Sequence, residues 1–136
     1  MPRALVDAGP LVAVVDSDEP GHAACVRVLR REAGPLLTVW PVLSEVLYLL
    51  RDFPRGQEAV LEMVEAGAVE IAPIGREDLP RIRALMRKYH DQPMDFADAA
   101  LVCVAERERI TRILTLDRRD FGIYRFGRIG RFEILP

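Results

Sequence analysis

Short apolar segments typical of strands alternate along the whole chain with longer segments of helical periodicity. This alternation restricts the fold more than any other feature, because strands joined by helices form a mostly parallel sheet with helices on both faces. Strands are predicted at 3–6, 36–39, 69–71, 112–115 and 131–135. Helices are predicted at 10–15, 21–33, 41–50, 56–66, 77–89 and 95–107. The sequence therefore predicts one α/β domain over residues 1–136, with a central sheet of about four to five strands.

The size and composition of the chain fit a single globular domain. Its 136 residues are 50% hydrophobic and 29% charged, which is enough to bury a core and excludes a disordered chain. No apolar run approaches the ~20 residues of a membrane span, and an acid at position 7 leaves no room for a signal peptide. Cys25 and Cys103 lie in apolar helical segments without further zinc ligands at a suitable spacing, so we expect reduced core cysteines and a cytoplasmic protein.

Two acidic residues directly follow predicted strands. Asp7 comes after the first strand, and Asp117 comes after the fourth. In open parallel sheets, functional sites form beyond the carboxyl ends of the strands. We therefore expect Asp7 and Asp117 to lie at one edge of the sheet, in a position suited to a site.

Two further acids occupy helices that are apolar nearly all round. Glu45 lies within Val42–Leu50, and Asp98 lies within 96–105. Such helices are expected to be buried, and a buried carboxylate has to be neutralised, paired or bound to a metal. For each of the two acids alone, a buried salt bridge to an arginine is as good an interpretation as a functional site. Asp95, one turn before Asp98, is more simply interpreted as a helix cap.

Together, these four acids favour a metal site over separate salt bridges. Carboxylates crowded at one sheet edge repel one another, and a divalent cation relieves that repulsion. Mg²⁺ and Mn²⁺ prefer carboxylate and water oxygens, and they catalyse displacement at phosphorus. The four residues are Asp7, Glu45, Asp98 and Asp117.

The charge of the chain is unevenly distributed. The net charge is −2, yet the segment from Arg107 to Pro136 holds eight arginines against four acids. A basic segment on an acidic protein can bind phosphates, and it can equally be a solvated face. Tyr124 and Phe126 alternate with arginines in this segment, which suits either stacking on RNA bases or ordinary core packing. Trp40 is interpreted as a core residue, and His22 and His90 as structural residues at helix ends.

Four short segments, in order and at consistent spacing, resemble the PIN-domain family. They are Leu5-Val6-Asp7-Ala8-Gly9-Pro10-Leu11, Leu43-Ser44-Glu45-Val46, Met94-Asp95-Phe96-Ala97-Asp98-Ala99-Ala100-Leu101-Val102 and Leu114-Thr115-Leu116-Asp117-Arg118-Arg119-Asp120-Phe121. Each motif is short, but the resemblance spans almost the whole chain. Within the family, the compact size and the last two segments resemble VapC-type toxins.

The resemblance implies a metal-dependent endoribonuclease that cleaves structured RNA such as tRNA or rRNA. It implies a type II toxin–antitoxin system, an antitoxin that covers the site, and a homodimer. A housekeeping RNA-processing nuclease and a non-cutting module that binds RNA or a partner remain alternatives. The implied catalytic and metal-binding acids are Asp7, Glu45, Asp98 and Asp117, with Mg²⁺ or Mn²⁺ as cofactor. Asp95, Thr115, Asp120 and Ser44 are possible outer members of the site, and Arg118, Arg119 and Arg125 are expected to bind RNA phosphates.

Overall fold

The computed structural model describes residues 4–32, 34–92, 94–127 and 130–136. Within these residues, five strands form one parallel sheet, as the sequence predicted. The order of the strands is β3-β2-β1-β4-β7. The strands are β1 (Ala4–Val6), β2 (Leu36–Thr38), β3 (Val69–Ile71), β4 (Arg112–Leu114) and β7 (Glu133–Leu135). Arg3 and Ala33, at the ends of a predicted strand and a predicted helix, lie outside the described residues.

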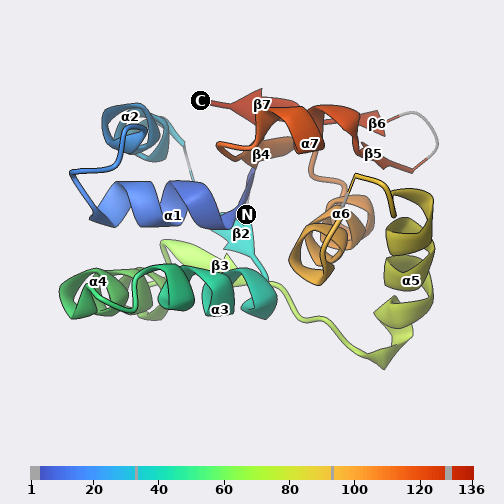
Figure 1. Cartoon of the computed structure of the whole chain (residues 1–136), viewed down its shortest axis with the longest axis horizontal. Coiled ribbons are helices and arrows are strands. Elements are labelled where there is room, and N and C mark those ends of the chain that lie inside the picture. Colours follow the sequence, from blue (N-terminus) through green and yellow to red (C-terminus); the bar gives the residue numbers. More distant parts are fainter. Residues whose placement is uncertain (1–3, 33, 93, 128–129) are drawn as a thin grey trace.

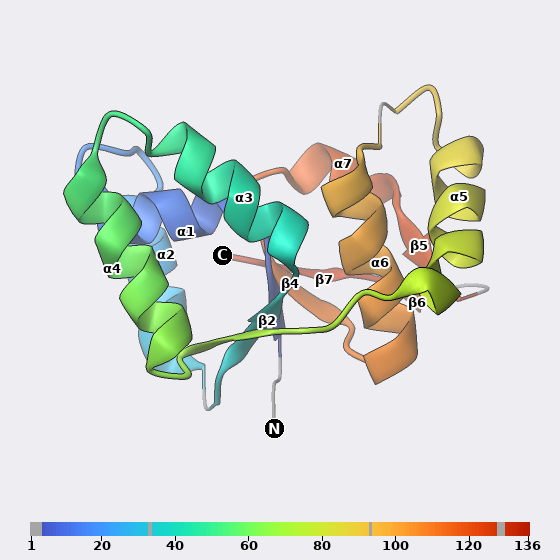
Figure 2. The same cartoon turned by 90° about the horizontal axis from the view of Figure 1, so that it is seen from below.

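The helices that join these strands lie on both sides of the sheet, as expected for parallel connections. One group of helices lies on one side of the sheet, and a second group lies on the other (Figures 1 and 2). The first group is α1 (Ala8–Val15), α2 (His22–Arg31), α3 (Trp40–Leu49) and α4 (Pro54–Glu65). The second is α5 (Leu79–Lys88), preceded by the short 3₁₀ helix η1 (Arg76–Asp78), and α6 (Phe96–Glu108).

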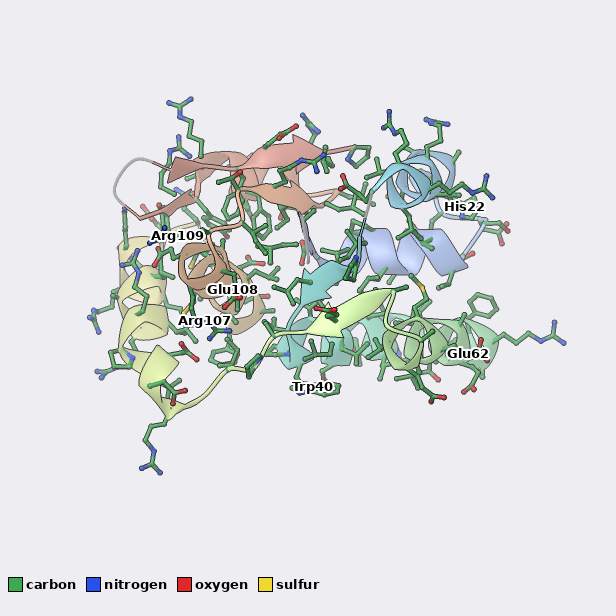
Figure 3. The ribbon with its side chains drawn as sticks, turned by 180° about the vertical axis from the view of Figure 1, so that it is seen from behind. His22, Trp40, Glu62, Arg107, Glu108 and Arg109 are labelled. Carbon is green, nitrogen blue, oxygen red and sulfur yellow. The ribbon has the colours of Figure 1, made fainter. Side chains whose placement is uncertain are left out.

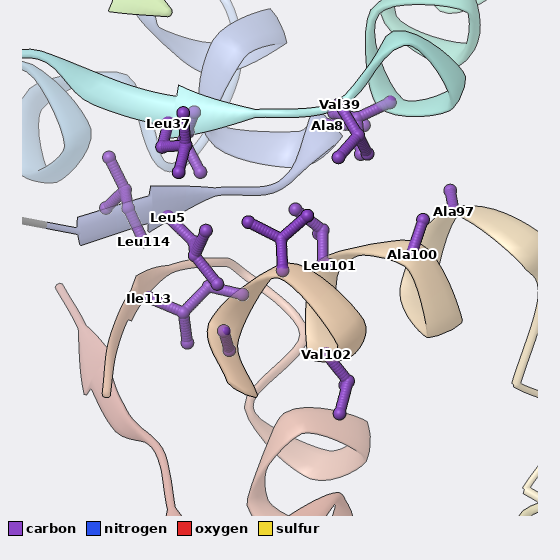
Figure 4. Close-up of a cluster of buried hydrophobic side chains, with 14 of the residues drawn as sticks. Leu5, Ala8, Leu37, Val39, Ala97, Ala100, Leu101, Val102, Ile113 and Leu114 are labelled. Carbon is purple, nitrogen blue, oxygen red and sulfur yellow. The ribbon is translucent and has the colours of Figure 1, made fainter. Parts of the chain in front are cut away.

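Helix α6 forms the centre of the hydrophobic core. Its residues 99–105 are all buried, as expected for a helix that is apolar on every face. Figure 4 shows Leu101 of this helix beside Leu5 of β1 and Ile113 of β4. Because α6 is packed on all sides, the residues at its two ends are held firmly in place.

Several elements differ from the sequence prediction. Helix α7 (Arg118–Ile123) and strand β5 (Arg125–Phe126), which pairs antiparallel with β6 (Gly130–Arg131), were not predicted. With six residues or fewer, each is too short to show hydrophobic periodicity. The predicted strand 131–135 is divided between β6 and β7, and α4 begins at Pro54 rather than at residue 56, because proline fits the first turn of a helix.

The interpretation of two residues on α3 was wrong. Trp40, predicted in the core, is 61% exposed and lies at the surface (Figure 3). Glu45, predicted to be buried, is exposed. The reason is that α3 is apolar all round without being buried all round, since Tyr48 and Leu49 also face solvent. In the described residues, no helix is long and apolar enough to cross a membrane.

Candidate active site

The ends of two paired strands bring Asp7 and Asp117 to the same edge of the sheet. β1 pairs with β4 in parallel register, and the Asp7 amide donates to the carbonyl oxygen of Leu114 over 3.0 Å. Asp7 then precedes α1, and Asp117 precedes α7, where its Oδ1 accepts the Asp120 amide over 3.0 Å. The prediction that strand ends position these two acids is confirmed.

Helices α6 and α3 add acids from two other directions. Asp95 caps the N-terminus of α6, because its Oδ1 accepts the Asp98 amide over 2.8 Å. Asp98 lies in the first turn of the same helix, and Glu45 projects from α3. The capping role predicted for Asp95 is therefore confirmed, and the cap places a further carboxylate beside the others.

These acids line one open pocket of about 510 Å³. None of its lining residues is basic. Among the described residues, the salt bridges involve other acids, so the alternative of a buried ion pair at Glu45 or Asp98 is wrong. The six acids of the pocket are Asp7, Glu45, Asp95, Asp98, Asp117 and Asp120.

Burial and neighbouring carboxylates raise the pKa values of several acids in the pocket. For Asp98, burial is the main cause, and the negative charges of Asp95 and Asp7 add to it, which brings the pKa to about 7. Burial also raises the pKa of Asp7, although hydrogen bonds from the Ala8 amide and Thr115 oppose the change. The exposed Glu45 is still partly shielded from water by the pocket, and this partial burial, with the charges of Asp7 and Asp95, raises its pKa. The carboxylates of the pocket therefore resist being ionised all at once. A bound cation would relieve the repulsion between them.

Asp120 belongs to the same electrostatic group. Burial and a hydrogen bond with Asp117 raise its pKa, and Arg119 opposes them. Because Arg119 lies outside the pocket lining, it reduces the repulsion at the rim without pairing with the inner acids.

Two hydroxyl groups hold the inner acids. The buried Thr115 donates to Asp7 Oδ2 over 3.0 Å and accepts the Asp117 amide over 3.0 Å, so it joins the two strand-end acids. The hydroxyl of Tyr124 donates to Asp98 Oδ2 over 3.0 Å. The sequence predicted Thr115 as an outer member of the site but missed this role of Tyr124, since no local spacing links residues 26 apart. Because Tyr124 is fully buried, the alternative that it stacks on RNA bases is wrong.

The other predicted members of the site do not line the acidic pocket. Ser44 is exposed and lines a neighbouring cavity of about 580 Å³ with Glu45 and Asp95. Arg118 donates to the Pro136 carbonyl oxygen, and Arg125 donates to the carbonyl oxygens of residues 122–124 at the end of α7. Arg119 is exposed. Arg128, the side chain of Phe126 and residue 129 lie outside the described part of the chain.

The donor set of the pocket fits a hard divalent cation, because every polar side chain that lines it ends in carboxylate oxygens. Among the residues that the structure describes, no three His, Cys, Asp or Glu side chains are arranged to hold a metal ion without adjustment.

The sequence and the fold both match known proteins. The model of the PIN domain matches residues 4–128. A relative from Mycobacterium tuberculosis, Ribonuclease VapC26, is 37% identical over 134 residues, which cover 97% of this chain and 99% of that protein.

Two solved structures have a similar fold. VapC20 of Mycobacterium tuberculosis, described as a Sarcin-Ricin loop cleaving toxin, aligns with a TM-score of 0.80 at 17% identity, over 93% of this chain and 98% of that one. A toxin–antitoxin complex from Klebsiella pneumoniae contains a chain that aligns with a TM-score of 0.68 at 18% identity, over 88% of this chain and 91% of that one.

Proposed function

Because the chain belongs to the PIN-domain family, we propose that it is a metal-dependent endoribonuclease and the toxin of a VapBC-like type II toxin–antitoxin system. The observation that carries the proposal is the pocket of six acids without a basic lining residue, at the edge of a parallel sheet. Such a pocket is costly for the folded protein unless it binds a cation. Nucleases of this family depend on a metal ion.

In this proposal, Asp7, Asp98 and Asp117 hold Mg²⁺ or Mn²⁺, and Glu45 completes the acidic ring from α3. The metal ion supplies the positive charge that supports hydrolysis of a phosphodiester bond. Thr115 keeps the Asp7 carboxylate aligned with the Asp117 backbone through its two hydrogen bonds. The caps made by Asp95 and Asp117 fix the first turns of α6 and α7, so the acids on both helices keep their places. Ser44 and Asp120 are outer members of the same site.

We assign structured RNA, such as tRNA or rRNA, as the substrate. The support is the relative named a ribonuclease and the fold shared with a toxin that cleaves the Sarcin-Ricin loop. The exposed Arg119 is the best placed of the three predicted arginines to contact a flanking phosphate. Arg118 and Arg125 use at least one nitrogen each within the protein, and their other nitrogens remain donors for RNA.

The partners of the proposed toxin are a cognate antitoxin and a second copy of the chain, in the cytoplasm. The antitoxin is supported by the similar fold in the Klebsiella pneumoniae complex. Large exposed apolar side chains lie near the pocket, as expected of a surface that another protein covers; they include Tyr48, Leu49, Phe96 and Leu116. Size-exclusion chromatography with light scattering tests the homodimer, and the product of the neighbouring gene tests the antitoxin by co-purification.

The decisive experiment incubates the purified, antitoxin-free protein with total RNA and Mg²⁺ or Mn²⁺. We expect discrete RNA fragments that disappear with excess chelator and in the Asp98→Asn variant. Asp52→Asn, a change of an exposed aspartate outside the pocket, serves as the matched control and should cleave like the wild-type protein. If the folded wild-type protein yields no metal-dependent fragment, the proposal fails, and RNA affinity without cleavage would then favour the non-cutting module. Cleavage without any antitoxin gene nearby would favour the housekeeping nuclease.

A further inference from the structure

We propose that Tyr124 is a positioning residue of the metal site, whose hydroxyl sets the orientation of the Asp98 carboxylate. The hydroxyl donates to Asp98 Oδ2 over 3.0 Å. Among the described residues, no hydrogen bond reaches Oδ1, the other oxygen of this carboxylate. One oxygen is thus held by the protein, and the other is left for a ligand in the pocket. The inference rests on the proposed function, because it concerns how the same pocket binds its metal.

The position of the Tyr124 hydroxyl is well defined because the ring is packed on two sides. The ring meets Tyr89 edge-on at a centroid distance of 5.1 Å and 64°, and it meets Phe121 at 5.1 Å and 79°. Tyr124 is fully buried. The two ring contacts, from Tyr89 directly after α5 and from Phe121 of α7, hold the ring, so its hydroxyl reaches α6 from a fixed direction.

A tyrosine hydroxyl orients a carboxylate without neutralising it. An arginine at the same place would pair with the charge of Asp98 and compete with a cation for it. Thr115 makes an equivalent contact with Asp7, to Oδ2 over 3.0 Å. Each of the two inner acids is therefore held at one oxygen by a neutral hydroxyl, whereas the charged donors of the protein lie elsewhere.

The expected cost of losing such a contact can be measured directly. Partners that orient metal ligands typically change metal affinity by about 10- to 100-fold when they are removed. Tyr124→Phe deletes only the hydroxyl and keeps both ring contacts. Tyr89→Phe is the matched control, because it deletes a hydroxyl that accepts the Arg125 amide and touches no carboxylate.

The experiment measures Mn²⁺ binding to the metal-free full-length protein by isothermal titration calorimetry. We expect the Kd for Mn²⁺ to rise about 10-fold or more in Tyr124→Phe and less than about twofold in Tyr89→Phe, with both variants folded by circular dichroism. In the Asp98→Asn background, Tyr124→Phe should add no further loss. With RNA as substrate at fixed Mn²⁺, kcat should fall in Tyr124→Phe while KM stays unchanged.

Two results would overturn the inference. Tyr124→Phe could bind Mn²⁺ as tightly as the wild-type protein, or both tyrosine variants could lose affinity equally, which would indicate general loosening of the core. A different result concerns the proposed function: if the folded wild-type protein binds no Mn²⁺, the metal-dependent activity fails and the inference fails with it.

Discussion

Two groups of acidic residues lie at opposite ends of helix α6, and they differ in whether arginines pair with them. At its C-terminal end, Asp78 and Glu106 each pair with an arginine. Arg107 donates to both oxygens of Asp78 at 3.2 and 3.1 Å, and Arg81 donates to both oxygens of Glu106 at 2.8 and 2.6 Å. At its N-terminal end, six acids share a pocket without a basic lining residue.

The difference appears in the pKa values of Glu106 and of three pocket acids. Hydrogen bonding to Arg81 lowers the pKa of Glu106 despite a contrary effect of burial. In the pocket, burial and like charges raise the pKa values of Asp7, Glu45 and Asp98. The chain contains enough arginines to neutralise the pocket, but folds so that they lie elsewhere. The paired acids are neutralised within the protein, whereas the pocket acids keep a negative charge that a bound cation would neutralise.

The largest expected effect follows the substitution of a pocket acid, which should abolish most RNA cleavage without destabilising the fold. Asp7→Asn removes one negative charge from the crowded site and keeps an oxygen that can accept from Thr115. We expect RNA cleavage to fall by a factor of about 100 or more, equivalent to about 3 kcal/mol or more in the activation barrier. The melting temperature of the metal-free protein should stay equal or rise. A clear fall in melting temperature would contradict the contrast, because Asp7 would then stabilise the fold as the paired acids do.

The converse effect is expected at the other end of α6. Arg107→Ala leaves Asp78, which is only 8% exposed, without its ion pair. We expect the free energy of unfolding to fall by about 3–5 kcal/mol, as measured by urea denaturation. Arg83→Ala, a change of an exposed arginine on α5, is the matched control and should change little. At a temperature where both variants are folded, cleavage per folded molecule should match that of the wild-type protein.

A smaller effect concerns pH. Since the pKa of Asp98 is raised from 3.8 to about 7, the folded protein binds this proton more tightly than the unfolded chain. The contribution of Asp98 to stability is therefore complete below about pH 4 and is lost as the pH rises through about 7. In chelator, we expect the melting temperature to fall between pH 5 and pH 8, and to fall less in Asp98→Asn than in Asp52→Asn. Mn²⁺ should restore stability at pH 8 in the wild-type protein only if the pocket binds it.

The smallest effect is expected for the more exposed member of the paired group. The side chain of Arg81 is 39% exposed, so solvent screens its ion pair with Glu106. Arg81→Ala should cost no more than about 1 kcal/mol of unfolding free energy, and raising the salt concentration should shrink the difference. If Arg81→Ala lowered the unfolding free energy as much as Arg107→Ala, solvent exposure would not explain the difference in strength between the two ion pairs.

The sequence predicted the sheet and its edge site because both follow from periodicity. The alternation of strands and helices predicted parallel pairing, and parallel pairing placed Asp7 and Asp117 side by side. Asp98 could be singled out because a carboxylate on an apolar helix is costly. These predictions depended on patterns that extend over several residues.

Other features could not be predicted because they depend on contacts between distant residues. Helix α3 presents Glu45 and Trp40 to solvent although its sequence looks buried, and only the packing of its neighbours decides this. Helix α7 has only six residues, and the Asp117 side chain caps its N-terminus. The hydrogen bond from Tyr124 to Asp98 joins the residue after α7 to the first turn of α6, and no local sequence pattern encodes the relative position of these two segments.

The hydrogen bond between Thr115 and Asp7 joins residues 108 positions apart in the chain. Strand β4, which Thr115 and Asp117 follow, pairs with β1 although a large part of the domain lies between the two strands in the sequence. Pairing over such a long separation is slow compared with local helix formation. A chain that ends before β4 still pairs β1 with β2, but it lacks Thr115, Asp117 and the strand that aligns them with Asp7. The acidic pocket is therefore complete only when β4 pairs with β1, and chains that end before β4 are expected to be inactive.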